Sequence, residues 1–467
     1  MRPALSIQGY SIVKEDLTPH QIAAIKTELT VCPYIPPNCG IIGPPPSYFH
    51  LFCESKTKLY VPKCYGLKKF GVPGVDKRSE GEVIDINFKG DLRPEQIPAV
   101  EAVLAACHDH AKTGGILNVF CGGGKTTMAL NILAKLGRKT MIVVHKDFLL
   151  NQWRERIDQF LPGARIGLIK AKIVDIEDKD IVIASLQSLA MKPYPVELFS
   201  SFGTLIVDEV HHTSAEVFSQ ALKKTVFKYT IGLSATVQRK DGLSKVFKWF
   251  LGDIVYKSTK RVDTVQVSVK EYFHSAQSYC KEHMIGTDKL NTARMINNIC
   301  AFEPRTQTIL DMLYKVLDTE PSRKVLILSD RRSHLQEMYE KIKHNGKSVG
   351  LYMGGMKQGA LEECETKQII LATFAIASEG YDQRGLDTLV LASPKSDIVQ
   401  SVGRILRDKP HERKHTPLVI DIIDCFSIFE KQGNKRIKYY KSQGYTIDGI
   451  PDKSPPIFEP GKCPIID

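Results

Sequence analysis

Short runs of consecutive, mostly apolar residues recur along this chain from about residue 115 onward. These runs alternate with helical segments. Such continuous hydrophobicity indicates strands covered on both faces, as in a parallel sheet flanked by helices. The expected strands are 141–145, 180–185, 204–208 and 229–233, followed after a pause by 324–329, 348–352, 368–373, 388–393 and 417–423. The pause predicts two consecutive α/β domains.

The remaining sequence adds an N-terminal region and a tail. The first 86 residues contain the proline-rich Y-I-P-P-N-C-G-I-I-G-P-P-P-S-Y, which disfavours long helices and central strands. We therefore expect a small accessory domain, irregular or β-rich. The predicted organisation is 1–86 accessory domain, 87–258 first α/β domain, 259–440 hinge and second α/β domain, and 441–467 extended tail.

Charge and hydropathy restrict the class of protein. The 467 residues include 64 Lys and Arg against 52 Asp and Glu, a net charge of +12, which favours a polyanionic partner such as nucleic acid or reflects a soluble surface. Lys14 and Glu15 interrupt the start where a signal peptide would be apolar, and no run approaches the length of a membrane span. We expect a soluble, intracellular protein with no membrane partner.

The segment N-V-F-C-G-G-G-K-T-T (118–127) lies between an expected strand and an expected helix, the context of a phosphate-binding loop. Its glycines would let backbone N–H groups converge on phosphates at a helix N-terminus. Lys125 would pair with the β- and γ-phosphates, and the Thr126 hydroxyl would hold Mg²⁺. Val119 replaces the first glycine of the usual pattern, so a simple glycine turn with a surface lysine is the alternative.

An acidic pair decides between these interpretations. Asp208 and Glu209 follow the apolar strand T-L-I-V, where two carboxylates are costly without a cation to face. Asp208 would hold Mg²⁺ through water, and Glu209 would orient and deprotonate an attacking water. A solvated acidic pair is disfavoured by the apolar strand before it. A nucleotide site is therefore expected despite Val119.

With these two motifs the sequence resembles the superfamily 2 helicases, and further segments resemble that family's motifs in order. They are L-R-P-E-Q (92–96), V-H-K-D-F-L-L-N-Q-W (144–153), I-A-S-L-Q-S-L (183–189), D-E-V-H (208–211), S-A-T (234–236), L-I-L-S-D-R-R (326–332), A-T-F-A-I-A-S-E-G-Y-D (372–382) and Q-S-V-G-R-I-L-R (400–407). The resemblance implies two tandem RecA-like domains that use ATP and Mg²⁺ and bind nucleic acid.

It also implies roles for individual residues. The catalytic set is Lys125, Asp208, Glu209, Arg404 and Arg407, with Thr126 and Asp208 as Mg²⁺ ligands. The nucleotide-binding set is Arg93, Gln96, Cys121, Gly122, Gly123, Gly124, Lys125, Thr126, Thr127, Gly380 and Asp382, in which Gln96 reads the base. The coupling set is His211, Ser234, Thr236 and Gln400, and the nucleic-acid-binding set is Lys146, Ser185, Gln187, Arg239 and Thr373.

The spacing Q-x-x-G-R-x-x-R suggests how the two domains would cooperate. Arg404 and Arg407 would neutralise charge on the transferred γ-phosphoryl group, but only when the domains close. ATP would then favour a closed cleft and hydrolysis an open one, so a bound strand would move stepwise. A solvated basic helix is the alternative that this spacing disfavours.

A narrower resemblance follows from G-L-S-A-T-V-Q-R-K-D-G-L and the later G-D-I-V-Y, which are similar to the XPB-like branch of DExH-type helicases. In that branch a basic–x–acidic triplet, here Arg239-Lys240-Asp241, follows motif III. The N-terminal K-L-Y-V-P-K-C-Y-G-L and the C-terminal Y-Y-K-S-Q-G-Y resemble helicases of nucleocytoplasmic large DNA viruses, including the poxvirus transcript-release helicase. This resemblance implies action on DNA in transcription or repair, transcription machinery as a partner, and a virion or host cytoplasm as the location.

Three alternatives stay open or are disfavoured. An RNA helicase acting on transcripts fits the same motifs, because phosphate contacts do not read the sugar. The terminal segments leave no room for the nuclease domain of a restriction-type motor, and a non-catalytic binding module would not need Lys125, Glu209 and both arginines. Strand separation needs a surface outside the motor, so we expect residues 1–86, with Arg239, to provide it.

Overall fold

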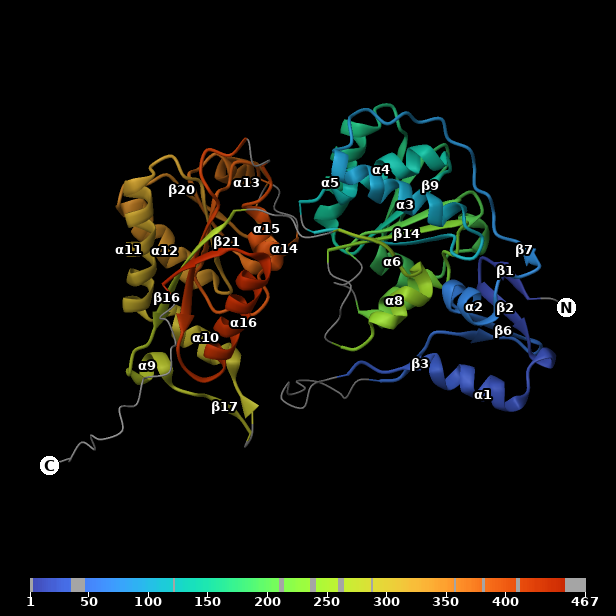
Figure 1. Cartoon of the computed structure of the whole chain (residues 1–467), viewed down its shortest axis with the longest axis horizontal. Helices are drawn as coiled ribbons and strands as arrows, with labels where there is room; N and C mark the ends of the chain where they lie inside the picture. The colour runs from blue at the N-terminus through green and yellow to red at the C-terminus, as the bar shows by residue number, and fades with distance from the viewer. Residues whose placement is uncertain are drawn as a thin grey trace. The chain divides into compact units, whose positions relative to one another are not determined.

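The computed structural model describes residues 3–34, 47–120, 122–209, 214–235, 241–258, 264–286, 289–356, 358–379, 383–408 and 412–449. They belong to two compact units, Met1–Arg261 and Val262–Asp467 (Figure 1). Within these ranges, none of the helices has the length and apolar character that crossing a membrane would require.

The first unit is built on an eight-stranded sheet in the order β11-β10-β12-β9-β13-β14-β8-β15. Its strands are β8 Gly114–Asn118, β9 Thr140–Val144, β10 Ile166–Lys170, β11 Ile173–Asp175, β12 Ile181–Ser185, β13 Thr204–Val207, β14 Tyr229–Ser234 and β15 Ile254–Lys257. Every neighbouring pair is parallel except β10 with β11. The expected parallel-sheet α/β architecture is confirmed.

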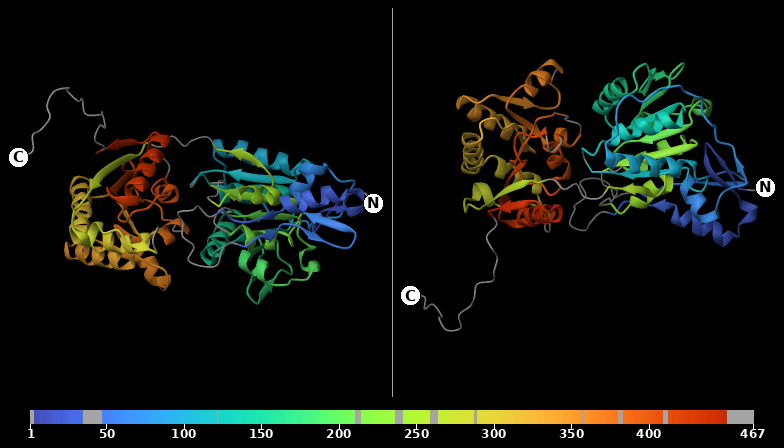
Figure 2. Two further views of the ribbon diagram at one scale, coloured as in Figure 1. Left: turned by 90° about the horizontal axis from the view of Figure 1, so that it is seen from below. Right: turned by 45° about the horizontal axis from the view of Figure 1, so that its top comes forward.

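Helices cover both faces of this sheet (Figure 2). They are α3 Ile97–His108, α4 Lys125–Leu136, α5 Asp147–Phe160, α6 Leu186–Met191, α7 Ala215–Leu222 and α8 Ser244–Leu251, with short 3-10 turns at Pro94–Gln96 and Val196–Phe199. Along β9, Ile142 packs with α3, α4 and α5, whereas Met141 and Val143 pack with α6, α7 and α8. Alternate residues of one strand thus enter opposite cores, which is why the strand is apolar throughout.

The N-terminal region contains both strands and helices. One sheet has the order β5-β6-β2-β1-β7, and β3 and β4 form a separate pair. The elements are β1 Ala4–Ser6, β2 Gly9–Val13, a 3-10 turn at Lys14–Asp16, α1 Pro19–Glu28, β3 Thr30–Val31, β4 Phe49–His50, β5 Cys53–Glu54, β6 Lys58–Val61, α2 Lys63–Phe70 and β7 Val75–Asp76. Helix α1 begins at Pro19, a residue suited to the first position of a helix. Its N-terminus is capped because the side chains of Thr18 and Gln21 each accept a hydrogen bond from the backbone N–H of the other residue.

This N-terminal region shares its core with the first parallel sheet. Leu5, Tyr10 and Leu67 belong to one continuous apolar cluster with Met141 and Phe218. Hydrogen bonds also join the two regions, since the Arg78 guanidinium donates to the carbonyls of Phe227 and Lys228, both at 3.0 Å. A chain beginning near Val83 would therefore lack part of the core of the first unit.

The second unit has a seven-stranded, fully parallel sheet in the order β20-β21-β19-β22-β23-β16-β24. Its strands are β16 Gln266–Tyr272, β19 Val325–Ser329, β20 Val349–Tyr352, β21 Ile369–Thr373, β22 Thr388–Leu391, β23 Leu418–Asp424 and β24 Thr446–Asp448. The other elements are α9 Gln277–Cys280, β17 Met284–Ile285, β18 Lys289–Leu290, α10 Thr292–Cys300, α11 Glu303–Thr319, α12 Arg332–His344, α13 Gln358–Glu365, α14 Phe374–Glu379, α15 Val399–Arg404 and α16 Ser427–Gln443.

Two segments differ from the expected organisation. The range assigned to the hinge and second α/β domain begins at residue 259, yet residues 266–272 within its first part form β16, which pairs with both β23 and β24 inside the second sheet. Residues 441–449, assigned to an extended tail, complete α16 and add β24 to the sheet edge. The boundary predicted at residue 440 therefore falls within α16. The strand β24 was not expected because its pairing partner, β16, lies far away in the sequence. Residues 450–467 are outside the described ranges.

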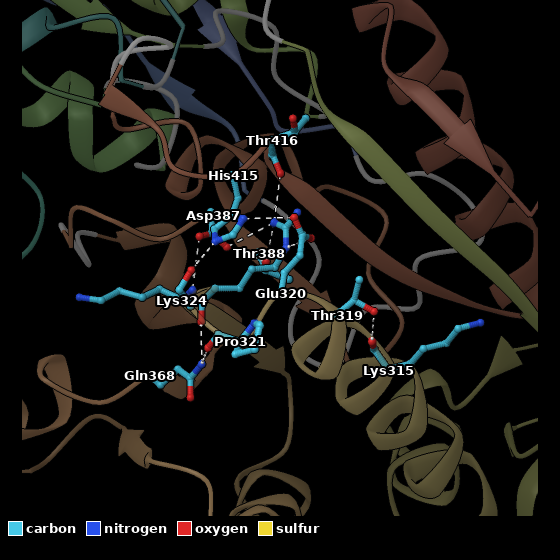
Figure 3. A network of polar contacts seen from close by, with 12 residues as sticks. Lys315, Thr319, Glu320, Pro321, Lys324, Gln368, Asp387, Thr388, His415 and Thr416 are labelled. Atoms are coloured by element: carbon cyan, nitrogen blue, oxygen red, sulfur yellow. Dashed lines mark hydrogen bonds and ion pairs between the residues drawn. The ribbon is translucent and has the colours of Figure 1, made fainter.

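Buried arginines hold the second unit together at both edges of its sheet. Arg305 binds Asp424 with two hydrogen bonds of 2.6 and 2.9 Å, at the carboxyl end of β23. At the opposite edge, Arg323 contacts Glu320 (2.6 Å), the Thr388 hydroxyl (3.2 Å) and the Thr416 carbonyl (3.0 Å). Figure 3 shows Glu320, Thr388 and Thr416 close together with Asp387. These contacts fix the amino-terminal ends of β19, β22 and β23, so we assign them to stability.

The buried Lys63 makes the stability of the first unit pH-dependent. Its Nζ donates to the Thr230 hydroxyl at 2.7 Å, and burial lowers the pKa of Lys63 to about 8. In the unfolded chain the pKa of this lysine is about 10.4. Between roughly pH 8 and pH 10.5 the unfolded state therefore binds more protons, so the folded state gains stability as the pH rises through that window.

We predict that Lys63→Met removes this gain. The difference in unfolding free energy between wild type and Lys63→Met should change by roughly 3 kcal/mol from pH 8 to pH 10.5. Both tryptophans of the chain, Trp153 and Trp249, lie in the first unit, so denaturant titrations followed by tryptophan fluorescence report on this unit. Lys68→Met, at an exposed position of the same helix, is the control and should show no such change. A pH-independent difference for Lys63→Met would contradict the prediction.

Candidate nucleotide site

Three consecutive glycines connect β8 to α4, and the geometry requires at least two of them. Gly122 and Gly124 have φ angles of 81° and 83°, in the left-handed region that favours glycine. A Cβ on Gly123 would lie 2.3 Å from Cγ1 of Val119. Val119, which stands where the first glycine was expected, is buried and packs beneath this turn. Helix α4 begins at Lys125, so the loop leads directly into a helix N-terminus of the kind that binds phosphate.

The Gln96 side chain lies against this loop. It is buried, and its Nε2 donates to the Gly123 carbonyl at 3.0 Å. Its Oε1 accepts from the backbone N–H of Arg93 at 2.9 Å. A Cβ on Gly124 would lie 2.1 Å from Gln96 Nε2 and 3.1 Å from an Arg93 guanidinium nitrogen. The structure thus brings Arg93 and Gln96 to the glycine loop, as expected for one site.

The acidic pair follows β13 directly. Asp208 is buried, and its Oδ1 accepts from the backbone N–H of Glu209 at 2.9 Å. Glu209 has a φ of 47°, an unfavourable conformation for a residue other than glycine and one that is concentrated at functional sites. Its Oε1 lies 3.1 Å from Nζ of Lys125. The start of α4 and the end of β13 therefore meet at the carboxyl edge of the sheet.

The electrostatics of this edge favour a bound cation. Burial and the neighbouring Glu209 raise the pKa of Asp208 to about 6, while Lys125 and Trp153 act in the opposite direction. Two carboxylates face one lysine, and the Thr126 hydroxyl belongs to the first turn of the adjacent helix. Carboxylate and hydroxyl oxygens are ligands that a hard divalent cation prefers. Asp208 and Thr126 therefore fit a Mg²⁺ ligand set.

Trp153 is a site residue that the sequence analysis did not identify. Its indole Nε1 donates to Asp208 Oδ2 at 2.9 Å, and its ring is buried beneath the sheet edge. In the sequence it is simply an apolar residue on the inner face of a helix. The available signal is chemical, since a buried tryptophan N–H usually finds an acceptor.

Other expected residues of the first unit lie at the same edge, each just after a strand or at its end. Lys146 is exposed before α5, following β9, and Ser185 ends β12 before α6, whose first turn holds the exposed Gln187. Ser234 ends β14, where its carbonyl accepts from Val119 N–H at 3.1 Å. Thr127 is half-buried in the first turn of α4. Cys121, His211, Thr236 and Arg239 lie outside the described residues.

In the second unit, Thr373 ends β21, and α15 carries the half-buried Gln400 and the buried Arg404. Arg407 is half-buried just beyond this helix. Gly380 and Asp382 lie outside the described residues.

Comparison with known proteins gives two family matches. Residues 89–239 match the family described as "Type III restriction enzyme, res subunit", and residues 308–409 match "Helicase conserved C-terminal domain". The chain is 35% identical to the "Putative ATP-dependent RNA helicase L396" of Acanthamoeba polyphaga mimivirus, over 94% of this chain and 85% of that protein. It is 29% identical to the "Probable helicase D10" of Escherichia phage T5, over 81% and 82% of the two chains. It is also 25% identical to the "Putative ATP-dependent RNA helicase QP509L" of African swine fever virus isolate Pig/Kenya/KEN-50/1950, over 71% and 69%.

We predict that Trp153→Phe weakens Mg²⁺-dependent ATP hydrolysis without unfolding the first unit. The variant keeps an aromatic ring in the core but removes the only donor of the indole, so Asp208 loses a hydrogen bond. Loss of a partner that orients a metal ligand typically reduces metal affinity or activity by about 10–100-fold. ATP hydrolysis measured against Mg²⁺ concentration should show a higher half-saturating concentration, a lower maximum rate, or both.

The matched control is Trp249→Phe. Trp249 packs edge-on against Tyr65, with 5.5 Å between ring centroids, and belongs to a different core cluster from Trp153. Its replacement should leave the Mg²⁺ dependence unchanged. An equal effect of both substitutions would show that loss of core packing, and not the hydrogen bond to Asp208, is responsible.

Proposed function

Because this chain belongs to the superfamily 2 helicases and is an ATP-dependent helicase, we propose that the loop 118–127 and the acidic pair form its ATPase site and that the motor acts on DNA. The observation that carries the site assignment is the 3.1 Å ion pair between Lys125 and Glu209, beside the buried Asp208. This pair joins the phosphate loop to the acidic strand end, which are far apart in the sequence. We further propose that residues 208–211 act as a DExH motif, as in the XPB-like branch.

In this proposal the residues of the first unit have distinct tasks. Backbone N–H groups of the glycine loop bind phosphate, and Lys125 moves from Glu209 to the β- and γ-phosphates when ATP binds. Asp208 and Thr126 hold Mg²⁺, which neutralises phosphate charge when bound. Glu209, released by Lys125, then accepts a proton from the attacking water. Gln96 and Arg93 recognise the adenine side of the nucleotide.

The proposal assigns transition-state stabilisation to Arg404 and Arg407 of the second unit. Their spacing after Gln400 supports this role, as does the match of residues 308–409 to the helicase C-terminal family. Ser234, His211, Thr236 and Gln400 would couple the nucleotide state to strand movement. Lys146, Ser185, Gln187, Arg239 and Thr373 would contact the phosphates of the strand.

DNA is proposed as the substrate from the XPB-like sequence after motif III. RNA is the second candidate, favoured by the names of the mimivirus and African swine fever virus relatives, both called putative ATP-dependent RNA helicases. Transcription machinery is the proposed partner in either case.

ATP hydrolysis measured in parallel with single-stranded DNA, duplex DNA and single-stranded RNA tests the substrate proposal. We expect DNA to stimulate turnover more than RNA at equal nucleotide concentration, and Lys125→Ala to abolish turnover under all conditions because the phosphate contact is lost. Stronger stimulation by RNA would replace the proposed substrate by the second candidate. Undiminished hydrolysis by Lys125→Ala would refute the site.

We also predict that Arg404→Ala lowers kcat by about a thousandfold, the effect typical of an arginine that stabilises phosphoryl transfer. Nucleic-acid affinity, measured by fluorescence anisotropy, should change little, because the partner of this arginine would be ATP. Arg407→Ala should behave in the same way. A proportional loss of affinity and turnover would instead place these arginines on the nucleic acid strand.

A further inference from the structure

Lysine side chains dominate the exposed face of α16 in the second unit. Lys431, Lys435 and Lys438 are all exposed, and they follow one another at intervals of four and three residues, which places them on one face of the helix. An α-helix rises by about 1.5 Å per residue, so these lysines occupy roughly 10 Å of its length. The three residues are called the lysine face below.

The opposite face of α16 is fixed against the sheet. Two buried side chains of this helix, Arg436 and Tyr440, both bind the buried Asp421 of β23. Arg436 Nη2 donates to Asp421 Oδ1 at 2.8 Å, and the Tyr440 hydroxyl donates to Oδ2 at 2.9 Å. A Cβ on Gly433 would lie 2.4 Å from Cγ2 of Ile423, so the helix lies directly against β23. The lysine face therefore points away from the sheet in a fixed direction.

The positive charge of the lysine face is not neutralised by the protein. Within the described part of the chain, no carboxylate forms an ion pair with any of its three lysines. By contrast, Lys341 of α12 pairs with Glu303 at 2.7 Å. Like charges four residues apart, such as Lys431 and Lys435, destabilise a helix. An anionic partner would offset this cost.

The composition of this surface favours duplex nucleic acid as the partner. The exposed residues of α16 are Glu430, Lys431, Asn434, Lys435, Lys438, Lys441 and Ser442. Protein interfaces are depleted in lysine and enriched in aromatic residues and methionine, which this set lacks. Proteins usually hold an unpaired strand by stacking its bases on aromatic side chains, which are also missing from the set. A duplex instead presents a dense row of phosphates, for which lysines alone suffice.

Helix α16 covers the same face of the second sheet as α14 and α15 (Figure 1). Phe374 of α14, Val402 of α15 and Tyr440 of α16 belong to one apolar cluster, whereas α11 and α12 pack against the other face. The Arg436 guanidinium also donates to the Lys395 carbonyl at 2.6 Å, in the segment that leads into α15. A duplex held on α16 would therefore be displaced together with α15.

We propose that the lysine face of α16 binds the phosphate backbone of duplex nucleic acid. Lys431, Lys435 and Lys438 each contact one phosphate. This surface goes beyond the proposed function, because none of the residues assigned there to the strand lies on α16. It lets the motor hold the duplex while other residues hold the strand that is being moved. The inference rests on membership of the helicase family and is independent of the assignment of the ATPase site.

The test compares two triple variants of the full chain that lose the same charge. One is Lys431→Gln/Lys435→Gln/Lys438→Gln, and the matched control is Lys315→Gln/Lys343→Gln/Lys414→Gln. The control lysines are exposed on α11, on α12 and in the segment before β23. Affinities for blunt duplexes of DNA and of RNA, and for the corresponding single strands, are measured by fluorescence anisotropy without ATP at several salt concentrations.

We expect the α16 variant to bind a duplex about tenfold more weakly at roughly 0.1 M salt, and single strands within about twofold of wild type. The slope of log affinity against log salt should become shallower by about 3 for the duplex, because each neutralised phosphate releases about one counterion. Lys431→Arg/Lys435→Arg/Lys438→Arg keeps the charge and should retain the wild-type slope. The duplex that loses more affinity, DNA or RNA, identifies the backbone that α16 holds.

Two outcomes would overturn the proposal. Equal duplex affinities and slopes for the α16 variant and the control would show that the lysine face is only a solvated surface. An equal loss of single-strand and duplex affinity would place these lysines on the path of the single strand instead. Neither measurement needs ATP hydrolysis, so both decide the role of α16 even if Lys125→Ala retains full turnover and the proposed ATPase site fails.

Discussion

The placement of two carboxylates at the end of a buried strand is the constraint on which the first unit depends. Asp208 cannot be solvated by bulk water, and Glu209 beside it adds repulsion, so the pKa of Asp208 rises. Lys125 and Trp153 offset this cost, one by charge and the other by a hydrogen bond. Trp153 comes from α5, which follows the neighbouring strand β9, whereas Lys125 begins α4, which follows β8 on the other side of β14. The sheet order and the glycine loop are therefore what allow the acidic pair to exist, and a divalent cation would complete its neutralisation.

The carboxyl edge of the first sheet and the amino-terminal edge of the second sheet have different physical roles. At the carboxyl edge of the first sheet lie the strained Glu209, the left-handed glycines and the exposed Lys146. Such conformations and charges cost stability and are retained where chemistry or binding needs them. The amino-terminal edge of the second sheet is instead closed by the Arg323 network, in which charges are paired and carbonyls are satisfied (Figure 3). The carboxyl edge of the first sheet thus carries the strained and charged residues of the candidate site, whereas the Arg323 network at the amino-terminal edge of the second sheet serves stability.

The composition of the N-terminal region wrongly suggested that it folds independently of the first parallel sheet. Its proline-rich sequence suggested a separate accessory domain, yet Leu5 and Leu67 enter the same cluster as Met141 and Phe218. Buried Lys63 and Arg78 add polar ties to Thr230 and to the carbonyls of Phe227 and Lys228. Removal of this region would expose apolar surface of the motor itself. Truncation of this region would therefore disturb the folding of the first unit, so it cannot test the expected task of residues 1–86 in strand separation.

The sequence alone determined the parallel α/β architecture, the approximate strand positions and the residues of the glycine loop and acidic pair, because these depend on local periodicity and on motifs of adjacent residues. Only the tertiary structure revealed that Trp153 binds Asp208, that Gln96 packs against Gly123, and that β24 joins the second sheet. Each of these features joins residues that are distant in the chain. Side-chain periodicity specifies which face of an element is buried, but the choice of the partner that buries it is made by the packing of the whole unit.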